Sequence, residues 1–318
     1  MSKITIVEIP AEDSLCVWKN SPHATVFTHY FVLKKLAYKT HWFLARKGEE
    51  ALCAWPVCLD EQGESYRPPF SYFVGPIWTF KGLNKPHHRQ LSVRLAVYEG
   101  FLDVFEKHFG KVVASLAIGI SDVRVFDWWN FHDTSKPRIQ IFPRYTAQIT
   151  PLSRLSKLEL GYRDVRRQQI RKTERAKNFF VDESATSSQL FDFYSETLSK
   201  QGKSVGEVSE KHMSVLQQLI SDGYGYLTAV KDLNSNGEVV FVTLTLRSAG
   251  TSNLILNLTN NAYRKTGVSV YGIHKSIERA ALLGDHTYDF NGANSPNRAD
   301  DKHSYGAEDR LYFDIVMN

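Results

Sequence analysis

The chain has 318 residues, about twice the usual size of a single domain, so we expect two domains. Its 42% hydrophobic and 23% charged residues, with a net charge of only +5, exclude disorder on a large scale. No apolar run reaches the roughly 20 residues that span a bilayer and no segment resembles a signal peptide, so a soluble, cytoplasmic protein without a membrane span is expected.

The first half of the chain predicts a mixture of helices and strands. Residues 42–45 and 51–59 have the pattern of a hairpin around Lys47-Gly48-Glu49. Residues 87–109 carry apolar side chains near helical spacing, and Gly110 ends that helix. The remaining predicted elements are a helix at 25–37, an aromatic strand-like piece at 71–78, and strands at 112–117, 123–129 and 139–149.

The second half begins with a basic helix, predicted over residues 155–177. Between Arg163 and Lys177, seven basic residues accompany two acidic ones, an excess that equals the net charge of the whole chain. The hairpin turn Asn236-Gly237 joins two strands farther along. The other predicted elements are helices at 190–200 and 207–222 and strands at 226–230, 239–246 and 254–259.

Residues 254–290 are the most informative part of the chain. Leu254, Leu256 and Leu258 alternate with more polar residues, which predicts a strand with these three side chains on one face. A basic, Gly-containing turn follows, then a helix from Val270 that Gly284 ends, and a second strand at 286–290. A glycine turn at a helix N-terminus presents free backbone N–H groups to anions such as phosphates. The candidate anion-binding residues are Arg264, Lys265, Gly267, Val268 and Ser269. The alternative is that Gly267 serves only as a helix-entry turn.

The order of elements indicates a duplicated architecture. Helices, an antiparallel meander, a glycine turn, a helix and a strand form a complete α+β unit in the second half, and the first half has a fainter version of the same order. We therefore predict two domains, 1–150 and 151–318, each with a mixed, mostly antiparallel sheet flanked by helices. Because the first copy lacks the glycine-turn motif, one chemical site is expected, mainly in the second domain.

Three motifs carry a family resemblance. Arg264-x-x-Gly267-x-Ser269 resembles the coenzyme A turn of the GCN5-related N-acetyltransferases (GNATs). Asp289-Phe290-Asn291-Gly292, followed by Lys302-His303-Ser304-Tyr305-Gly306-Ala307, is similar to the D-F-x-G and K-x-x-F-G-A segments of the FemABX family. The run from Arg167 to Lys172 resembles the R-x-x-I-R-K segment of the same family. Together they extend over most of the chain and imply a tandem-GNAT acyltransferase.

The resemblance implies transfer of an acyl group to an amine, with acyl-CoA as co-substrate. The acceptor would be an amino sugar, free or nucleotide-linked, used in cell-envelope polysaccharide. Tyr305 replaces the usual Phe, and the long helical hairpin with which some family members engage transfer RNA is absent. The alternatives are an aminoacyl-tRNA donor with a peptidoglycan precursor as acceptor, in which case nucleic acid becomes a partner, and a non-catalytic binding protein on a transferase fold.

Three residues are the predicted catalytic set. Asp289 would be the general base or would orient the acceptor, Lys302 would bind donor or stabilise charge, and Tyr305 would protonate the leaving thiolate. Alternatively, Asp289 fixes a turn, Tyr305 packs, and Lys302 is a solvated surface lysine.

The predicted substrate-binding residues divide into two groups. Arg167, Arg171 and Lys172 match positions near acceptor phosphates in the family, although an exposed basic face is an equal interpretation. Asn257 and Asn294 are polar candidates at the ends of strands.

No metal is predicted. The 11 histidines show no ligand spacing, and the three cysteines lack metal-ligand pairing, so they are expected to be reduced thiols. A homodimer is left open.

Overall fold

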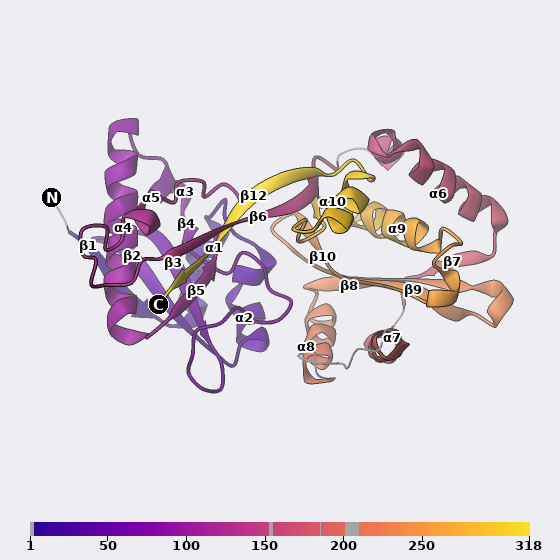
Figure 1. Ribbon diagram of the computed structural model, residues 1–318, viewed down its shortest axis with the longest axis horizontal. Helices are drawn as coiled ribbons and strands as arrows, with labels where there is room; N and C mark the ends of the chain where they lie inside the picture. Colours follow the sequence, from indigo (N-terminus) through magenta and orange to yellow (C-terminus); the bar gives the residue numbers. More distant parts are fainter. Residues whose placement is uncertain (1–2, 153–154, 185, 201–209) are drawn as a thin grey trace. The chain divides into compact units, whose positions relative to one another are not determined.

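The computed structural model describes residues 3–152, 155–184, 186–200 and 210–318. The chain divides into two compact units: the first comprises Met1–Arg144 and Leu311–Asn318, and the second comprises Tyr145–Arg310. The chain passes between them within strand β6 (Gln140–Ile149) and within strand β12 (Glu308–Met317) (Figure 1). The boundary thus precedes the one expected at residues 150 and 151. The last strand returns to the first unit because its second half pairs with β5 (Val112–Ser115).

The first unit is built around an antiparallel sheet in the order β1-β2-β3-β4. Its strands are β1 (Ile4–Ile9), β2 (Lys39–Lys47), β3 (Glu50–Leu59) and β4 (Ile77–Trp78). β2 and β3 form the predicted hairpin, whereas only two residues of the strand expected at 71–78 pair. The predicted long helix is α4 (His87–His108), and its Phe101 and Phe105 meet Trp55 of β3 edge to face.

The prediction of a strand at residues 123–129 was wrong, because this segment forms the short helix α5 (Arg124–Trp128). The Asp122 carboxylate accepts a hydrogen bond from the Arg124 backbone N–H, 3.3 Å away, at the start of the first turn. Phe126 is buried against Tyr98 of α4, with ring centroids 4.9 Å apart. Local hydrogen bonding and one buried face therefore outweigh the strand propensity of this aromatic run. The remaining helices are η1 (Ala11–Asp13), α1 (Ser14–Lys19), η2 (Val26–Thr28), α2 (Tyr30–Leu36) and α3 (Phe80–Leu83), and η2 with α2 replaces the helix expected at 25–37.

The second unit contains strands in the order β6-β11-β10-β9-β8-β7. The predicted antiparallel meander is present as β8 (Gly225–Asp232), β9 (Glu238–Ser248) and β10 (Thr251–Thr259), and β7 (Phe179–Asp182) pairs with β8. β11 (Thr287–Asp289) is parallel to β10, and helix α9 (Val268–Leu282) makes the crossover between them, as predicted.

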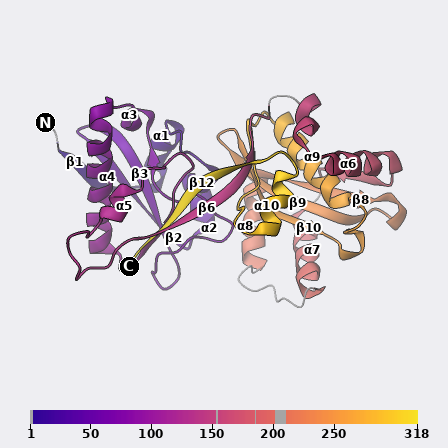
Figure 2. The same ribbon diagram turned by 45° about the horizontal axis from the view of Figure 1, so that its top comes forward.

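Helices cover both faces of this sheet. Figures 1 and 2 show α6 (Asp164–Ala176) and α9 on one face, with α7 (Ser187–Lys200) and α8 (Glu210–Ser221) on the other. The basic segment, expected as one helix, is the 3-10 helix η3 (Leu155–Gly161) followed by α6. The break follows Gly161, whose carbonyl oxygen would lie only 2.7 Å from a Cβ on Gly306. Residues 207–209 of the expected α8 lie outside the described residues. The remaining elements are η4 (Leu233–Ser235), η5 (Asn261–Tyr263) and α10 (Pro296–His303).

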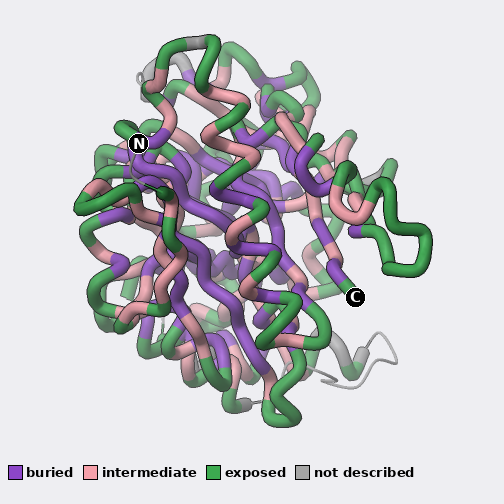
Figure 3. The backbone as a smooth tube through the Cα atoms, turned by 90° about the vertical axis from the view of Figure 1, so that its left-hand side faces the viewer, coloured by how far each residue is buried: buried purple, intermediate pink, exposed green. Residues whose placement is uncertain are grey.

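The hydrophobic core of each unit contains residues of its strands and of its helices. Figure 3 shows buried residues along the strands and exposed ones at turns and on outer helix faces. In the second unit, Val268, Ile273 and Ile277 of α9 join the core over the sheet. The predicted α+β class, with mostly antiparallel sheets flanked by helices, is confirmed. Within the described ranges, no helix has the length and apolar character needed to cross a bilayer.

Candidate functional site

Strands β10 and β11 pair over only three residues and then part. Their parallel register runs from Thr251↔Thr287 to Asn253↔Asp289, after which β11 ends while β10 continues to Thr259. A bulge between Leu254 and Leu256 leaves Ile255 outside the ladder with β9. The edge of β10 that follows Asn253 therefore lacks a neighbouring strand on the β11 side.

The bulge also overturns the expectation that Leu254, Leu256 and Leu258 share one face. Leu254 pairs with Thr245 and Leu256 with Leu244. Residues directly opposite one another lie on the same face of a sheet, whereas successive residues of a strand alternate. Leu254 and Leu256 consequently lie on opposite faces, because Ile255 inserts one extra residue between the two pairs.

The N-terminus of α9 lies in the turn that the sequence predicted to bind anions. Gly267 caps the helix at φ 86°, and a Cβ there would lie 3.1 Å from Thr173 Oγ1 of α6. The Val268 N–H donates to Thr266 Oγ1 at 3.3 Å, but within the described chain the N–H groups of Ser269 and Val270 have no acceptor. Two aligned donors at the positive end of a 15-residue helix suit a phosphate oxygen.

Arg264 and Lys265 precede this turn and are both exposed. No carboxylate among the described residues forms an ion pair with either side chain. Gly267 and Val268 are buried and Ser269 is half-buried, so of these three residues Ser269 has the largest exposed fraction. The five predicted anion-binding residues are thus brought together at one helix end.

Asp289 ends β11 and is completely buried. Its carboxylate accepts hydrogen bonds from Thr146 Oγ1, from Gln148 Nε2 at 2.8 Å and from the Asn291 backbone N–H at 2.8 Å. Burial raises the pKa of Asp289, and these three donors oppose the rise. The carboxylate ties β11 to β6 and to the following turn.

Lys302 of α10 closes that turn from the other side. Its Nζ donates to the Asn291 carbonyl oxygen at 3.0 Å and to the Gly292 carbonyl oxygen. Burial lowers the pKa of Lys302 to about 8, against the influence of the Asp289 charge, which raises it. The D-F-x-G and K-x-x segments, separate in sequence, are therefore one structural feature.

Tyr305 lies in an aromatic cluster and is 1% exposed. Its ring is 5.7 Å from Phe290 and 5.5 Å from Tyr162, and the Arg166 guanidinium lies 5.4 Å above it. Burial raises the pKa of the Tyr305 phenol, so the hydroxyl stays protonated at neutral pH. Arg166, which the sequence did not single out, also donates to Ser304 Oγ at 2.7 Å and to Asp301 at 2.5 Å.

The basic helix α6 is largely paired with acidic residues. Arg163 binds Asp300 at 2.7 Å, Arg167 binds Asp164, and Arg171 lies 3.9 Å from Glu159. Lys172 is exposed. The same helix contacts Gly267 through Gln169 and Thr173, so α6 connects the N-terminus of α9 to α10.

The two predicted asparagines have different surroundings. Asn257 is exposed on β10, opposite Thr243. Asn294 uses both atoms of its amide on the backbone of Tyr145, accepting from its N–H at 2.8 Å and donating to its carbonyl oxygen at 3.0 Å. Its amide therefore holds the middle of β6, at Tyr145.

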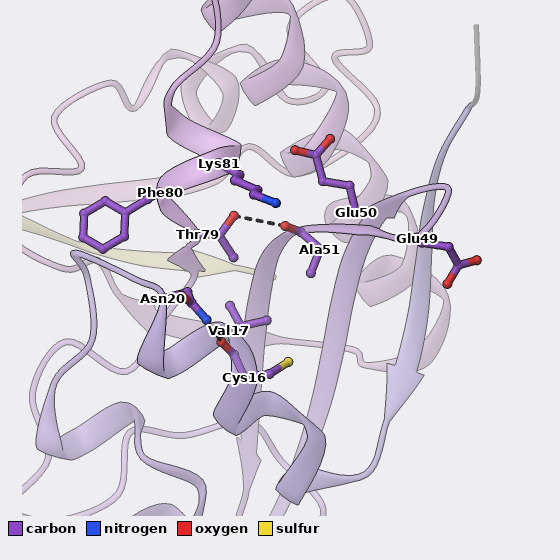
Figure 4. Close-up of a pocket in the computed structure, with 9 residues that line it drawn as sticks. All are labelled: Cys16, Val17, Asn20, Glu49, Glu50, Ala51, Thr79, Phe80 and Lys81. Atoms are coloured by element: carbon purple, nitrogen blue, oxygen red, sulfur yellow. Dashed lines mark hydrogen bonds between the residues drawn. The ribbon is translucent and has the colours of Figure 1, made fainter.

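A cavity of about 450 Å³ lies in the first unit (Figure 4). Thr79 lies at its wall and donates to the Ala51 carbonyl oxygen at 3.0 Å, and Phe80, 60% exposed, stands at its rim. None of the predicted site residues lines it. Across the described ranges, no group of three or more His, Cys, Asp or Glu side chains could hold a metal ion.

The sequence and the fold were compared with protein families and with solved structures. A model of the GNAT acetyltransferase domain matches residues 161–302. Among solved structures, the chain is similar to FemX, with 11% identity over 97% of this chain and 96% of that chain and a TM-score of 0.66. It is also similar to a tandem GNAT protein from the clavulanic acid biosynthesis pathway, with 12% identity, coverages of 99% and 98% and a TM-score of 0.55. The chain is similar as well to L-PGS from Bacillus licheniformis, with 14% identity over 97% of this chain and 92% of that chain and a TM-score of 0.54. No curated protein matches the sequence.

Proposed function

The chain has a tandem GNAT fold of the FemABX-like kind, and we propose that it transfers an acyl group from coenzyme A to an amine. The observation that carries the proposal is the N-terminus of α9, which follows β10 along the chain. Two of its backbone N–H groups have no acceptor in the described chain, the cations Arg264 and Lys265 precede it, and β10 itself runs on beyond its last pair with β11. Such a helix end suits a pyrophosphate, and the end of the β10–β11 pairing leaves β10 without a paired strand on that side, which suits an extended chain.

The reaction needs few protein groups. The amine nitrogen attacks the thioester carbon, a C–N bond forms and the C–S bond breaks; nitrogen loses one proton and sulfur gains one. Lys302 uses two of its three N–H donors on Asn291 and Gly292, so one remains for the developing negative charge on oxygen. Tyr305, protonated and without a hydrogen-bond partner for its hydroxyl among the described residues, is the proposed proton donor to sulfur.

Asp289 is better suited to positioning than to accepting a proton from substrate. Three donors already surround its carboxylate. In this proposal Asp289 holds the Asn291–Gly292 turn, and Lys302 acts on the reacting atoms from the same turn.

An aminoacyl-tRNA donor is less well supported. Arg163, Arg166, Arg167 and Arg171 of the basic segment each have a carboxylate within 4 Å. Cations paired in this way contribute less to binding a phosphate backbone. The amine acceptor that the family resemblance suggests is an amino sugar, with its nucleotide-linked forms to be tested first.

Isothermal titration with acetyl-CoA tests the donor, and filter binding with charged tRNA at two salt concentrations tests the alternative. We expect saturable heat with acetyl-CoA and tRNA retention that follows bulk charge alone. No binding at about 1 mM acetyl-CoA, near the upper end of ordinary KM values, would overturn the proposal.

A further inference from the structure

Asn291 has one polar atom that nothing in the described chain engages. Its N–H donates to Asp289 at 2.8 Å, its carbonyl oxygen accepts from Lys302 at 3.0 Å, and its side-chain Nδ2 donates to the Leu254 carbonyl oxygen at 3.2 Å. Side-chain Oδ1 is buried without a partner, and the residue is 7% exposed. A buried acceptor left unsatisfied costs roughly 1–3 kcal/mol, so its retention calls for an occupant.

The orientation of this amide is set by its surroundings. The Leu254 carbonyl oxygen can only accept, so the nitrogen of the Asn291 amide must face it. Oδ1 is then the free atom, and the missing partner must be a hydrogen-bond donor. A φ of 49° holds the residue in a left-handed conformation that asparagine tolerates better than most residues.

The position of Asn291 beside β10 indicates which kind of hydrogen-bond donor could reach Oδ1. β11 stops pairing at Asp289, and two residues later the Asn291 side-chain amide donates to the β10 carbonyl of Leu254, one residue beyond the last β10–β11 pair. A side-chain amide that donates to one strand and offers an acceptor on its other side behaves as a peptide group in a ladder. The group that completes such a ladder is an amide N–H in an extended chain.

We propose that Asn291 Oδ1 accepts a hydrogen bond from an amide N–H of the pantetheine arm of the thioester donor. This inference rests on the proposed function, because coenzyme A supplies the extended chain with its amides. In this arrangement Asn291 binds the pantetheine arm of coenzyme A, whereas the N-terminus of α9 binds the phosphates of coenzyme A.

The test is calorimetric titration of the full chain with two probes, coenzyme A and adenosine 3′,5′-bisphosphate. The second probe carries no pantetheine amide. We expect Asn291→Gly to weaken coenzyme A roughly threefold to tenfold, the effect of one neutral hydrogen bond, and to leave the bisphosphate unchanged.

Asn236→Gly is the matched control, because Asn236 also has a positive φ of 53° but lies in the β8–β9 turn. Unchanged coenzyme A affinity in Asn291→Gly would overturn the inference, as would a parallel loss of affinity for the bisphosphate. If the unaltered chain binds no coenzyme A, it is the proposed function that fails. If the unaltered chain binds coenzyme A and Asn291→Gly binds it equally well, only this inference fails.

Discussion

Gly272 of α9 lies directly against the ring of Phe241 of β9. A Cβ built on Gly272 would lie 2.1 Å from Phe241 Cδ1, far closer than two carbons can approach. The absence of a side chain therefore sets how closely α9 can pack on the sheet, and with it the position of the helix N-terminus at the candidate site.

Gly272→Ala is expected to lower the free energy of unfolding by about 1–3 kcal/mol, because the ring or the helix must shift to make room. Gly100→Ala in α4 is the control. It gains the same helix propensity, but its Cβ would meet only the flexible Ile6 side chain, at 3.0 Å. Calorimetric melting of both variants checks the prediction, and an equal or smaller loss for Gly272→Ala would contradict it.

Gly267→Ala should weaken coenzyme A binding by roughly tenfold or more, since left-handed backbone costs a side chain about 1–2 kcal/mol and Thr173 Oγ1 blocks the added Cβ. Gly284→Ala tests the same strain at the other end of α9, where φ is 80° and no atom lies within 4 Å of the new Cβ. Both variants should lose stability through backbone strain, and Gly267→Ala somewhat more because only its Cβ meets Thr173. Calorimetric titration should find weakened binding only for Gly267→Ala, and a comparable loss for Gly284→Ala would show that strain alone is responsible.

Lys302 predicts a pH dependence of stability. Folding lowers its pKa from 10.5 to about 8, so between these values the unfolded chain keeps a proton that the folded chain releases. Below pH 8 Lys302 is charged in the folded chain, and the full cost of burying that charge lowers the free energy of unfolding. This cost disappears as the pH rises from about 8 to 10.5. Relative to Lys302→Met, the unfolding free energy of the unaltered chain should therefore rise between pH 7 and pH 10, by at most about 3 kcal/mol.

Lys275→Met is the companion measurement. For Lys275, burial is outweighed by its ion pairs with Glu278 and Glu174, which raise its pKa. Its contribution should stay constant between pH 7 and pH 10 and decline only at higher pH. Denaturant titrations at several pH values measure both differences. A difference for Lys302→Met that is flat or falls with pH would refute the assignment.

The parts of the fold that local patterns determine could be predicted. The β2–β3 hairpin, α4, the β8–β9–β10 meander and α9 each follow from a periodicity and a turn within one segment. The bulge at Ile255 leaves no such trace, because alternating leucines look the same with or without an extra residue.

The geometry of the candidate site was predictable only where it depends on residues that are neighbours in sequence. The turn at Gly267 could be found because glycine, cations and the helix start are adjacent in sequence. The partners of Asp289 could not, since Thr146 and Gln148 come from β6, some 140 residues earlier. Arg166 and Asp301 are almost as far apart in sequence. Their ion pair could not be foreseen, so the basic run was expected to have fewer acidic partners than it has.

Asp289 offers a substitution that separates its two candidate roles. In Asp289→Asn, the new amide keeps an oxygen for the Asn291 N–H, while the Thr146 hydroxyl can rotate and the Gln148 amide can turn to present an acceptor. Asp289→Ala leaves all three donors unpaired, which should cost about 2–4 kcal/mol. A positioning role therefore predicts that Asn preserves stability and coenzyme A binding and that Ala does not.

A general base predicts a different pattern for the same pair. Both substitutions remove the carboxylate, so both would slow acyl transfer by about a hundredfold or more, and the acidic limb of the pH–rate profile would disappear even in the well-folded Asn variant. Since three donors already surround the carboxylate, we expect Asp289→Asn to transfer at a rate near that of the unaltered chain, with the shape of its pH profile retained. Loss of transfer in that variant with unchanged melting would return Asp289 to the catalytic set.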